Sequence, residues 1–151
     1  MTDRQFDEYF SLHEFVQSKT ADEHGIDNWA YLNEDAEERL RFLVQMFLTP
    51  LRCLVGKPVI IDSGFRCEDL NKVVGGVPTS QHRLGEAADI RIMDNGIPSN
   101  ELFGIITGPD FLVFDQCILY KTFVHVSLRN PIEGKVNRQE AFAAKTQSCR
   151  Y

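Results

Sequence analysis

The chain has 151 residues, of which 43 % are hydrophobic and 25 % charged, and it carries a formal net charge of −6. These values are typical of one globular domain. They argue against nucleic acid as the main partner, because neutralising phosphates requires a basic face. The longest apolar runs are also far shorter than a membrane span.

The N-terminal stretch MTDRQFDEYF has three acidic residues and no continuous apolar core. We therefore expect no signal peptide and synthesis in the cytoplasm. The four cysteines, Cys53, Cys67, Cys117 and Cys149, form no CxxC pair. They are expected to be reduced structural thiols.

Residues 1–56 are expected to form a helical part. FSLHEFVQS begins a short helix with a capping box, in which Ser11 accepts from the backbone and Glu14 reaches back. The longest helical periodicity runs from Asn33 to Val55, with acidic residues in its first turn. Pro50 lies inside this helix and should kink or split it.

Residues 57–128 are expected to form the sheet part of a single domain, 1–151. The predicted strands are Val59 to Ile61, AADIRI, FLVFDQCILY and TFVHVSL, and the last two are joined by a tight connection near Lys121. CEDLNKVV and a segment beginning near Ser99 read as helices. The remainder, 129–151, is a polar tail with a predicted helix over RQEAFAAKT. This order predicts an α+β domain with N-terminal helices packed on a small, largely antiparallel sheet.

Strand alternation brings out two polar residues. Asp89 in AADIRI and His125 in FVHVSL each lie on the face opposite their aliphatic neighbours. If the strands are neighbours, the two side chains project into one groove, where the preceding loop can deliver His82. Two histidines and a carboxylate are a typical catalytic zinc set, with a position left for water. The alternative is a structural histidine bonded to the backbone and an aspartate at a turn.

The stretch SGFRCEDLNKVVGGVPTSQHRLGEAADIRI, followed by FDQCILYKTFVHVSL, resembles the zinc D-Ala-D-Ala carboxypeptidase family of peptidoglycan peptidases, and more narrowly its short single-domain phage and prophage members. The matching positions are Ser63-Gly64-Phe65-Arg66, then Ser80, His82, Gly85, Ala87 and Asp89, and finally Val124-His125. The resemblance extends to about Arg138.

The resemblance implies a role for each matched residue. It implies that His82, Asp89 and His125 bind one Zn²⁺ ion. Arg66 matches the arginine that engages the substrate's carboxylate or polarised carbonyl, for which a permanently charged guanidinium is suited. Ser80 shapes the loop or touches the substrate.

The sequence departs from the family at the general base. Family members often carry a Glu or His shortly before the last histidine, where this chain has Tyr120, Lys121 and Thr122. A water that attacks an amide needs a proton acceptor. Asp115 is the candidate carboxylate, with Tyr120 as the second candidate catalytic residue although tyrosine is a poor base at neutral pH. The alternative for Asp115 is a structural carboxylate.

We therefore expect a monomeric zinc metallopeptidase that hydrolyses an amide bond in peptidoglycan stem peptides or cross-bridges. It would act as a carboxypeptidase or an endopeptidase, in the manner of a prophage endolysin that reaches the cell wall after release. The alternatives are a non-catalytic zinc domain that binds cell wall or serves as a phage structural component, and a metal-free adaptor.

Overall fold

A computed structural model describes residues 3–108 and 112–145. The longer helical elements are α1 (Leu12–Val16), α2 (Lys19–Glu23), α3 (Glu34–Leu43), the π-helical turn η2 (Val44–Leu48), α4 (Thr49–Val55), α5 (Glu68–Val73) and α6 (Ser99–Thr107). The 3-10 turns are η1 (Asn28–Tyr31), η3 (Gln81–Leu84), η4 (Met93–Asn95) and η5 (Pro131–Glu133). The strands are β1 (Val59–Ser63), β2 (Ala87–Ile92), β3 (Gln116–Leu119), β4 (Val124–Ser127) and β5 (Glu140–Ala143).

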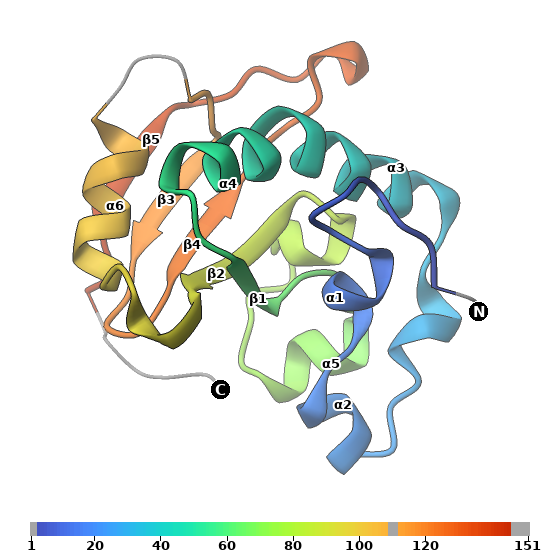
Figure 1. Cartoon of the computed structure of the whole chain (residues 1–151). Coiled ribbons are helices and arrows are strands. Elements are labelled where there is room, and N and C mark those ends of the chain that lie inside the picture. The colour runs from blue at the N-terminus through green and yellow to red at the C-terminus, as the bar shows by residue number, and fades with distance from the viewer. Residues whose placement is uncertain (1–2, 109–111, 146–151) are drawn as a thin grey trace.

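The strands form one sheet in the order β1-β2-β4-β3-β5 (Figure 1). All neighbouring pairs are antiparallel except β3 and β5, which are parallel. The predicted α+β class, with N-terminal helices and a largely antiparallel sheet, is confirmed. The hairpin β3-β4, which the sequence placed around Lys121, supplies the central strand β4 and its neighbour β3.

The aliphatic face of the sheet is covered by helices. Figure 1 shows α3, η2 and α4 as one long helical rod in front of the strands, with α6 beside it. The α6 helix contacts β2, β3 and β4. The core residues between these layers are almost completely buried and include Leu40, Leu43, Phe47, Leu51, Ala88, Ile90, Ile92, Leu102, Ile106, Val124 and Val126. The opposite face is therefore left for polar side chains.

The long helix changes its winding just before Pro50. The N–H of Thr49 bonds to the carbonyl of Val44, five residues back, so the helix widens by one residue over Val44–Leu48. Proline lacks an N–H, and its ring clashes with the carbonyl four residues earlier. A wider π turn relieves that clash while the helix axis continues. The sequence predicted a kink or a split at Pro50, and the structure has instead a π turn just before it.

The C-terminal segment differs from the expectation. The sequence predicted a helix over RQEAFAAKT, but the described part of this segment contains the strand β5. Gln139 has a left-handed φ of 55°, and its N–H bonds to the carbonyl of Phe114. All four β5 residues are exposed on this edge strand, so no alternating burial marks it. The helix prediction is wrong because tertiary pairing outweighed local propensity.

The predicted strand FLVFDQCILY is also shorter than expected. The chain bends at Asp115, and β3 begins at Gln116. Before the bend, Leu112 and Phe114 point into the core. After the bend, Ile118 lines the polar side of the sheet. A regular alternation of inward and outward side chains therefore does not run through Asp115.

Three of the cysteines, Cys53, Cys67 and Cys117, are free thiols. Cys149 lies outside the described residues. Burial raises the pKa of the Cys117 thiol to about 12, as expected for an unreactive core residue. No helix in residues 3–108 and 112–145 is long and apolar enough to cross a membrane.

Candidate metal centre and its groove

Three potential metal ligands meet on the polar side of the sheet. Asp89 on β2 lies directly opposite His125 on β4 in the strand register. His82 lies in η3, just before β2. One ligand atom from each residue lies within 4.8 Å of the others. The two strands are therefore neighbours, which is the condition under which the sequence placed Asp89 and His125 in one groove.

The backbone around residue 64 fixes one histidine. A β-bulge between Ile61 and Ser63 brings Ser63 opposite Asp89. Gly64 then packs so tightly on helix α1 that a Cβ at this position would lie 2.5 Å from the carbonyl oxygen of Phe15. The carbonyl oxygen of Gly64 lies 2.7 Å from His82 Nδ1. This contact leaves Nε2 of His82 facing Asp89.

The loop that carries His82 is held at both ends. The hydroxyl of Ser80 accepts a hydrogen bond from the His82 N–H at 3.2 Å. Gly85 has a φ of +80°, and a Cβ there would lie 2.4 Å from the carbonyl oxygen of Ala36. Only glycine fits this close, left-handed turn. Gly85 thus lets the backbone turn closely beside the site.

Both oxygens of Asp89 have partners. Its Oδ1 lies 2.9 Å from His125 Nδ1 and 3.3 Å from His82 Nε2. Its Oδ2 accepts a hydrogen bond from Arg66 Nη2 at 3.3 Å. Asp89, His82 and Arg66 are each at most 1 % exposed. The carboxylate therefore presents one oxygen to the histidines and is held by the other.

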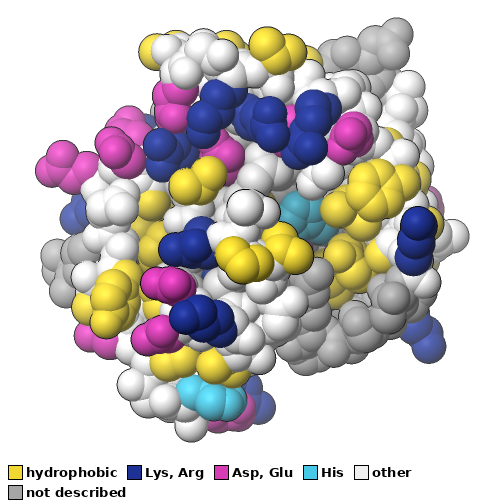
Figure 2. All heavy atoms as spheres, turned by 180° about the vertical axis from the view of Figure 1, so that it is seen from behind, with side chains coloured by type: hydrophobic (Ala, Val, Ile, Leu, Met, Phe, Trp, Pro, Cys, Tyr) yellow, Lys and Arg dark blue, Asp and Glu magenta, His cyan; other side chains and the backbone are white. Residues whose placement is uncertain are grey.

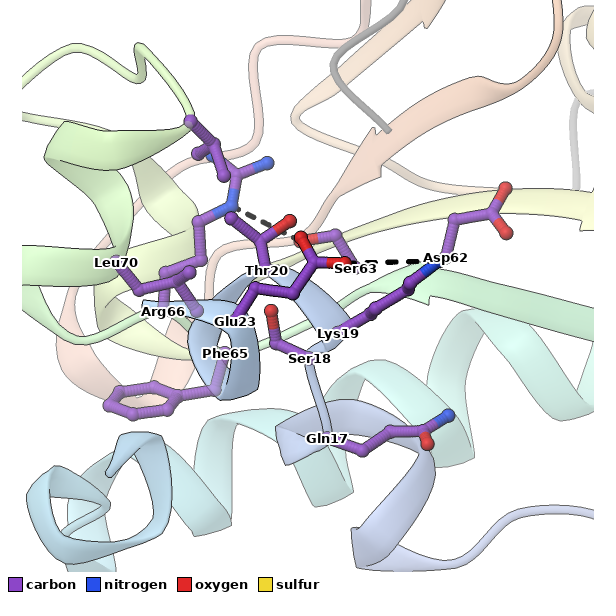
Figure 3. A pocket seen from close by; sticks show the side chains of 11 residues that line it. Gln17, Ser18, Lys19, Thr20, Glu23, Asp62, Ser63, Phe65, Arg66 and Leu70 are labelled. Carbon is purple, nitrogen blue, oxygen red and sulfur yellow. Dashed lines mark hydrogen bonds and ion pairs between the residues drawn. The ribbon is translucent and has the colours of Figure 1, made fainter. Parts of the chain in front are cut away.

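The guanidinium of Arg66 is surrounded by protein groups. Its Nε donates to Ser63 Oγ at 3.1 Å, and its Nη1 donates to Asn71 Oδ1 at 3.3 Å. Figure 3 shows Arg66 beside a separate cavity of about 290 Å³, formed with residues of the α2 region such as Ser18 and Thr20. The resemblance implied that Arg66 touches the substrate. In this structure its guanidinium faces Asp89 and this cavity.

The electrostatics of the three residues suit a metal ion. Burial lowers the pKa of His82 to about 4, although Asp89 opposes this effect. Burial raises the pKa of Asp89, but the adjacent imidazoles outweigh it and hold that pKa well below its usual range. At neutral pH His82 is thus a neutral imidazole and Asp89 an ionised carboxylate, the forms that coordinate metals. Two nitrogens and one oxygen are also ligands that zinc accepts.

The histidines open onto a groove of about 410 Å³. Its floor is β3 and β4, where the alternating residues Gln116, Ile118 and Tyr120 lie beside His125. The loop between α5 and η3 lines it as well. Figure 2 shows this side of the molecule, where a recessed histidine is bordered by hydrophobic side chains and Lys and Arg side chains gather above it.

The two candidate catalytic residues lie in different surroundings. Tyr120 lines the groove, and its ring stacks on Phe123 with a centroid distance of 4.5 Å. Asp115 is fully buried beside the groove rather than in its lining. Its carboxylate accepts two hydrogen bonds from the Arg138 guanidinium, at 2.7 and 3.0 Å, and pairs with Arg129 Nε at 3.2 Å.

These contacts decide the protonation of Asp115. Burial raises its pKa, but the hydrogen bonds and the charge of Arg138 outweigh burial and lower it. The Arg138 backbone N–H also donates to Oδ1 at 3.0 Å. A carboxylate so stabilised in its ionised form is a weak base. Its contacts match the structural alternative left open by the sequence.

Sequence reasoning missed three site residues. Asn71, which bonds Arg66, lies in a short helix where nothing in the pattern marks a buried amide. Arg129 and Arg138 fall in the segment expected to be a polar tail, yet both line the groove. Asp115, the shared partner of Arg129 and Arg138, is distant from both in sequence. Only the fold brings these two arginines to it.

Comparison with known proteins gives one finding. The family model described as Peptidase M15 matches residues 8–127. This span is most of the chain and contains His82, Asp89, His125, Arg66 and Ser80. No curated protein matches the sequence.

Proposed function

The chain belongs to the Peptidase M15 family of D-Ala-D-Ala carboxypeptidase-type metallopeptidases, and on that premise we propose that it hydrolyses an amide bond in peptidoglycan stem peptides or cross-bridges. The observation that carries this proposal is the cluster of His82, Asp89 and His125 at the base of a peptide-sized groove. Action as a prophage-type endolysin, on the wall and as a monomer, is part of the same proposal.

The proposed metal ligands are His82 Nε2, Asp89 Oδ1 and His125 Nδ1. A zinc ion bound there would supply Lewis acidity, which polarises a carbonyl oxygen and lowers the pKa of a water molecule. The Gly64 carbonyl fixes the orientation of His82, and Arg66 fixes that of Asp89. Such contacts orient ligands and commonly change metal affinity by 10–100-fold. We therefore assign Arg66 to positioning Asp89.

The groove residues would hold the peptide. An extended substrate can lie along β3 and β4, with its cleaved bond at the level of His125 and Ile118. Tyr120 is proposed to donate a hydrogen bond from its hydroxyl to the substrate carbonyl as charge develops on the oxygen. Stacking on Phe123 restricts its ring. Ser80 is proposed to hold the His82 loop rather than the substrate.

Hydrolysis needs a proton acceptor in the groove, whereas a second candidate function, binding of wall peptide without cleavage, does not. Among the described residues that line the groove there is no Asp or Glu, and Asp115 is paired with two arginines. A zinc domain that binds wall peptide without cleaving it needs no proton acceptor. That absence favours the second candidate, whereas the peptidase fold and complete ligand set favour hydrolysis.

One experiment separates the two functions. Zinc-loaded protein is incubated with purified peptidoglycan, and released fragments are read by mass spectrometry beside a chelated sample. New peptide termini that disappear on chelation, and with His82→Ala but not with His24→Ala, support the peptidase. His24 is an exposed histidine outside the site. Intact peptidoglycan that retains zinc-loaded protein in a pull-down supports the binding domain instead.

A further inference from the structure

One end of the groove is cationic. The described residues that line it include Arg129 and Arg138 but no acidic side chain. This is unexpected in a chain with a net charge of −6. The exposed fractions of the two arginine side chains are 32 % and 40 %. A buried carboxylate, Asp115, lies behind both of them.

The two arginines are not equivalent. Arg138 binds Asp115 through Nε and Nη2, and its Nη1 lies 3.7 Å from Glu140. Arg129 reaches Asp115 only through Nε. Arg138 therefore contacts two carboxylates, those of Asp115 and Glu140, whereas Arg129 contacts one of them through a single nitrogen. Among the contacts of the described residues, both terminal amino groups of Arg129 remain available as donors.

The position of this end follows from strand register. Ile118 lies opposite His125, and Asp115 is three residues earlier in the chain. Three residues of antiparallel strand span about 10 Å. Tyr120 lies on the other side of the His125 level. The metal centre is thus in the middle of the groove, and the backbone of Asp115, which holds both arginines, lies about 10 Å along the chain from the His125 level on the Gln116 side.

That separation is longer than one residue of substrate. In a peptide that loses a single C-terminal residue, the free carboxylate lies within about 4 Å of the cleaved bond. We propose that Arg129, held by Asp115 beside Arg138, binds a carboxylate of the substrate peptide that lies two or three residues from the cleaved bond. This inference rests on the proposed function and refines its substrate class. Guanidinium donors suit this role because they bind two carboxylate oxygens at once.

The test uses N-acetylated peptides with one D-Ala–D-Ala bond. The short peptide ends with the second D-Ala, and the longer peptide continues for two further residues. Each is made with a C-terminal carboxylate and with a C-terminal amide. A further pair carries Glu or Gln two residues before the bond. This pair tests for a carboxylate on the N-terminal side of the cleaved bond. In the zinc-loaded protein we expect kcat/KM to be about tenfold higher for the acid of the longer peptide, or for Glu over Gln. The short peptide should discriminate much less.

Variants assign the effect to Arg129. Arg129→Gln should bring the acid-to-amide ratio of the longer peptide close to one, and Arg129→Lys should retain part of it. Arg39→Gln is the matched control, because Arg39 pairs through Nε with Glu133 and does not line the groove. Equal rates within both pairs, acid against amide and Glu against Gln, or an unchanged ratio in Arg129→Gln for the pair that discriminates, would overturn the inference while hydrolysis itself stands.

A binding measurement covers the case without turnover. The side-chain Nε–H signals of the zinc-loaded protein are followed by NMR while the longer acid or its amide is added. A shift of the Arg129 signal with the acid alone supports the carboxylate site even if no peptide is cleaved, in which case only the proposed hydrolysis fails. The same response to acid and amide, and also to the Glu and Gln peptides, contradicts the site.

Discussion

Two fully buried aspartates on neighbouring parts of the sheet have opposite surroundings. Asp89 presents one oxygen to two imidazoles, and its other oxygen accepts a hydrogen bond from Arg66. Asp115 is bound by two guanidinium groups and a backbone N–H. Metal ions bind to a carboxylate oxygen whose neighbours are themselves ligands, whereas a carboxylate neutralised by cations can only hold those cations in place. Neighbours, more than burial, therefore decide what a carboxylate does.

The largest expected effect is at the histidines around Asp89. His82→Ala removes one of three ligands and leaves Asp89 with one imidazole, so stoichiometric zinc should be lost. His24→Ala should keep it. Metal content measured by elemental analysis after dialysis decides the point, and full occupancy in His82→Ala would remove His82 from the ligand set.

Next in size is the arginine behind Asp89. Arg66→Gln should weaken zinc binding by about 10–100-fold, because Oδ2 of Asp89 loses its charged partner. Arg91→Gln is the control, since Arg91 pairs with Asp62, which is not one of the three candidate ligands. Competition with a fluorescent chelator measures the zinc affinity. Unchanged affinity with a raised KM would instead assign Arg66 to the substrate.

The corresponding change at Asp115 should act on the fold. Asp115→Asn keeps the shape but weakens three charge-assisted contacts, so we expect a loss of about 1–3 kcal/mol in unfolding free energy with zinc affinity unchanged. Denaturant unfolding provides the measurement. If the variant has wild-type stability and binds zinc but has no activity, Asp115 is the general base. That result would contradict the structural role assigned to Asp115.

The pH dependence of stability sharpens the same contrast. The pKa of Asp115 is lower in the folded state than its ordinary value near 3.9. The folded protein therefore binds fewer protons than the unfolded chain, and the stabilisation is full above about pH 4 and is lost as pH falls through the folded pKa. The stability difference between wild type and Asp115→Asn should shrink over that range. A difference that stays constant with pH would contradict the ion pairs.

The smallest effect is expected at Ser80. Ser80→Ala removes one hydrogen bond to the His82 N–H, which contributes about 1 kcal/mol. Stability should fall slightly and zinc affinity little, because the Gly64 carbonyl still orients the ring. A large rise in KM at unchanged stability would show that the hydroxyl touches the substrate.

The sequence predicted the parts of this molecule that depend on local pattern. Alternation placed Asp89 and His125 on the polar face, and Pro50 marked the change in the long helix. The role of Arg66 could not be read this way, because its partners Asn71 and Asp89 meet it only through the fold. The C-terminal strand and Arg129 were missed for the same reason, since an exposed edge strand has no pattern of its own and Asp115 lies far away in sequence.

The parallel pairing of β5 with β3 has a consequence for synthesis. A ribosome makes His82, Asp89 and His125 before it makes Arg138 and β5. The three candidate ligands can therefore come together on a chain that still lacks β5, whereas Asp115 has no Arg138 guanidinium to pair with until that residue is made. A product that ends before Arg138 would keep the candidate ligands and lose one of the two arginines that line the groove.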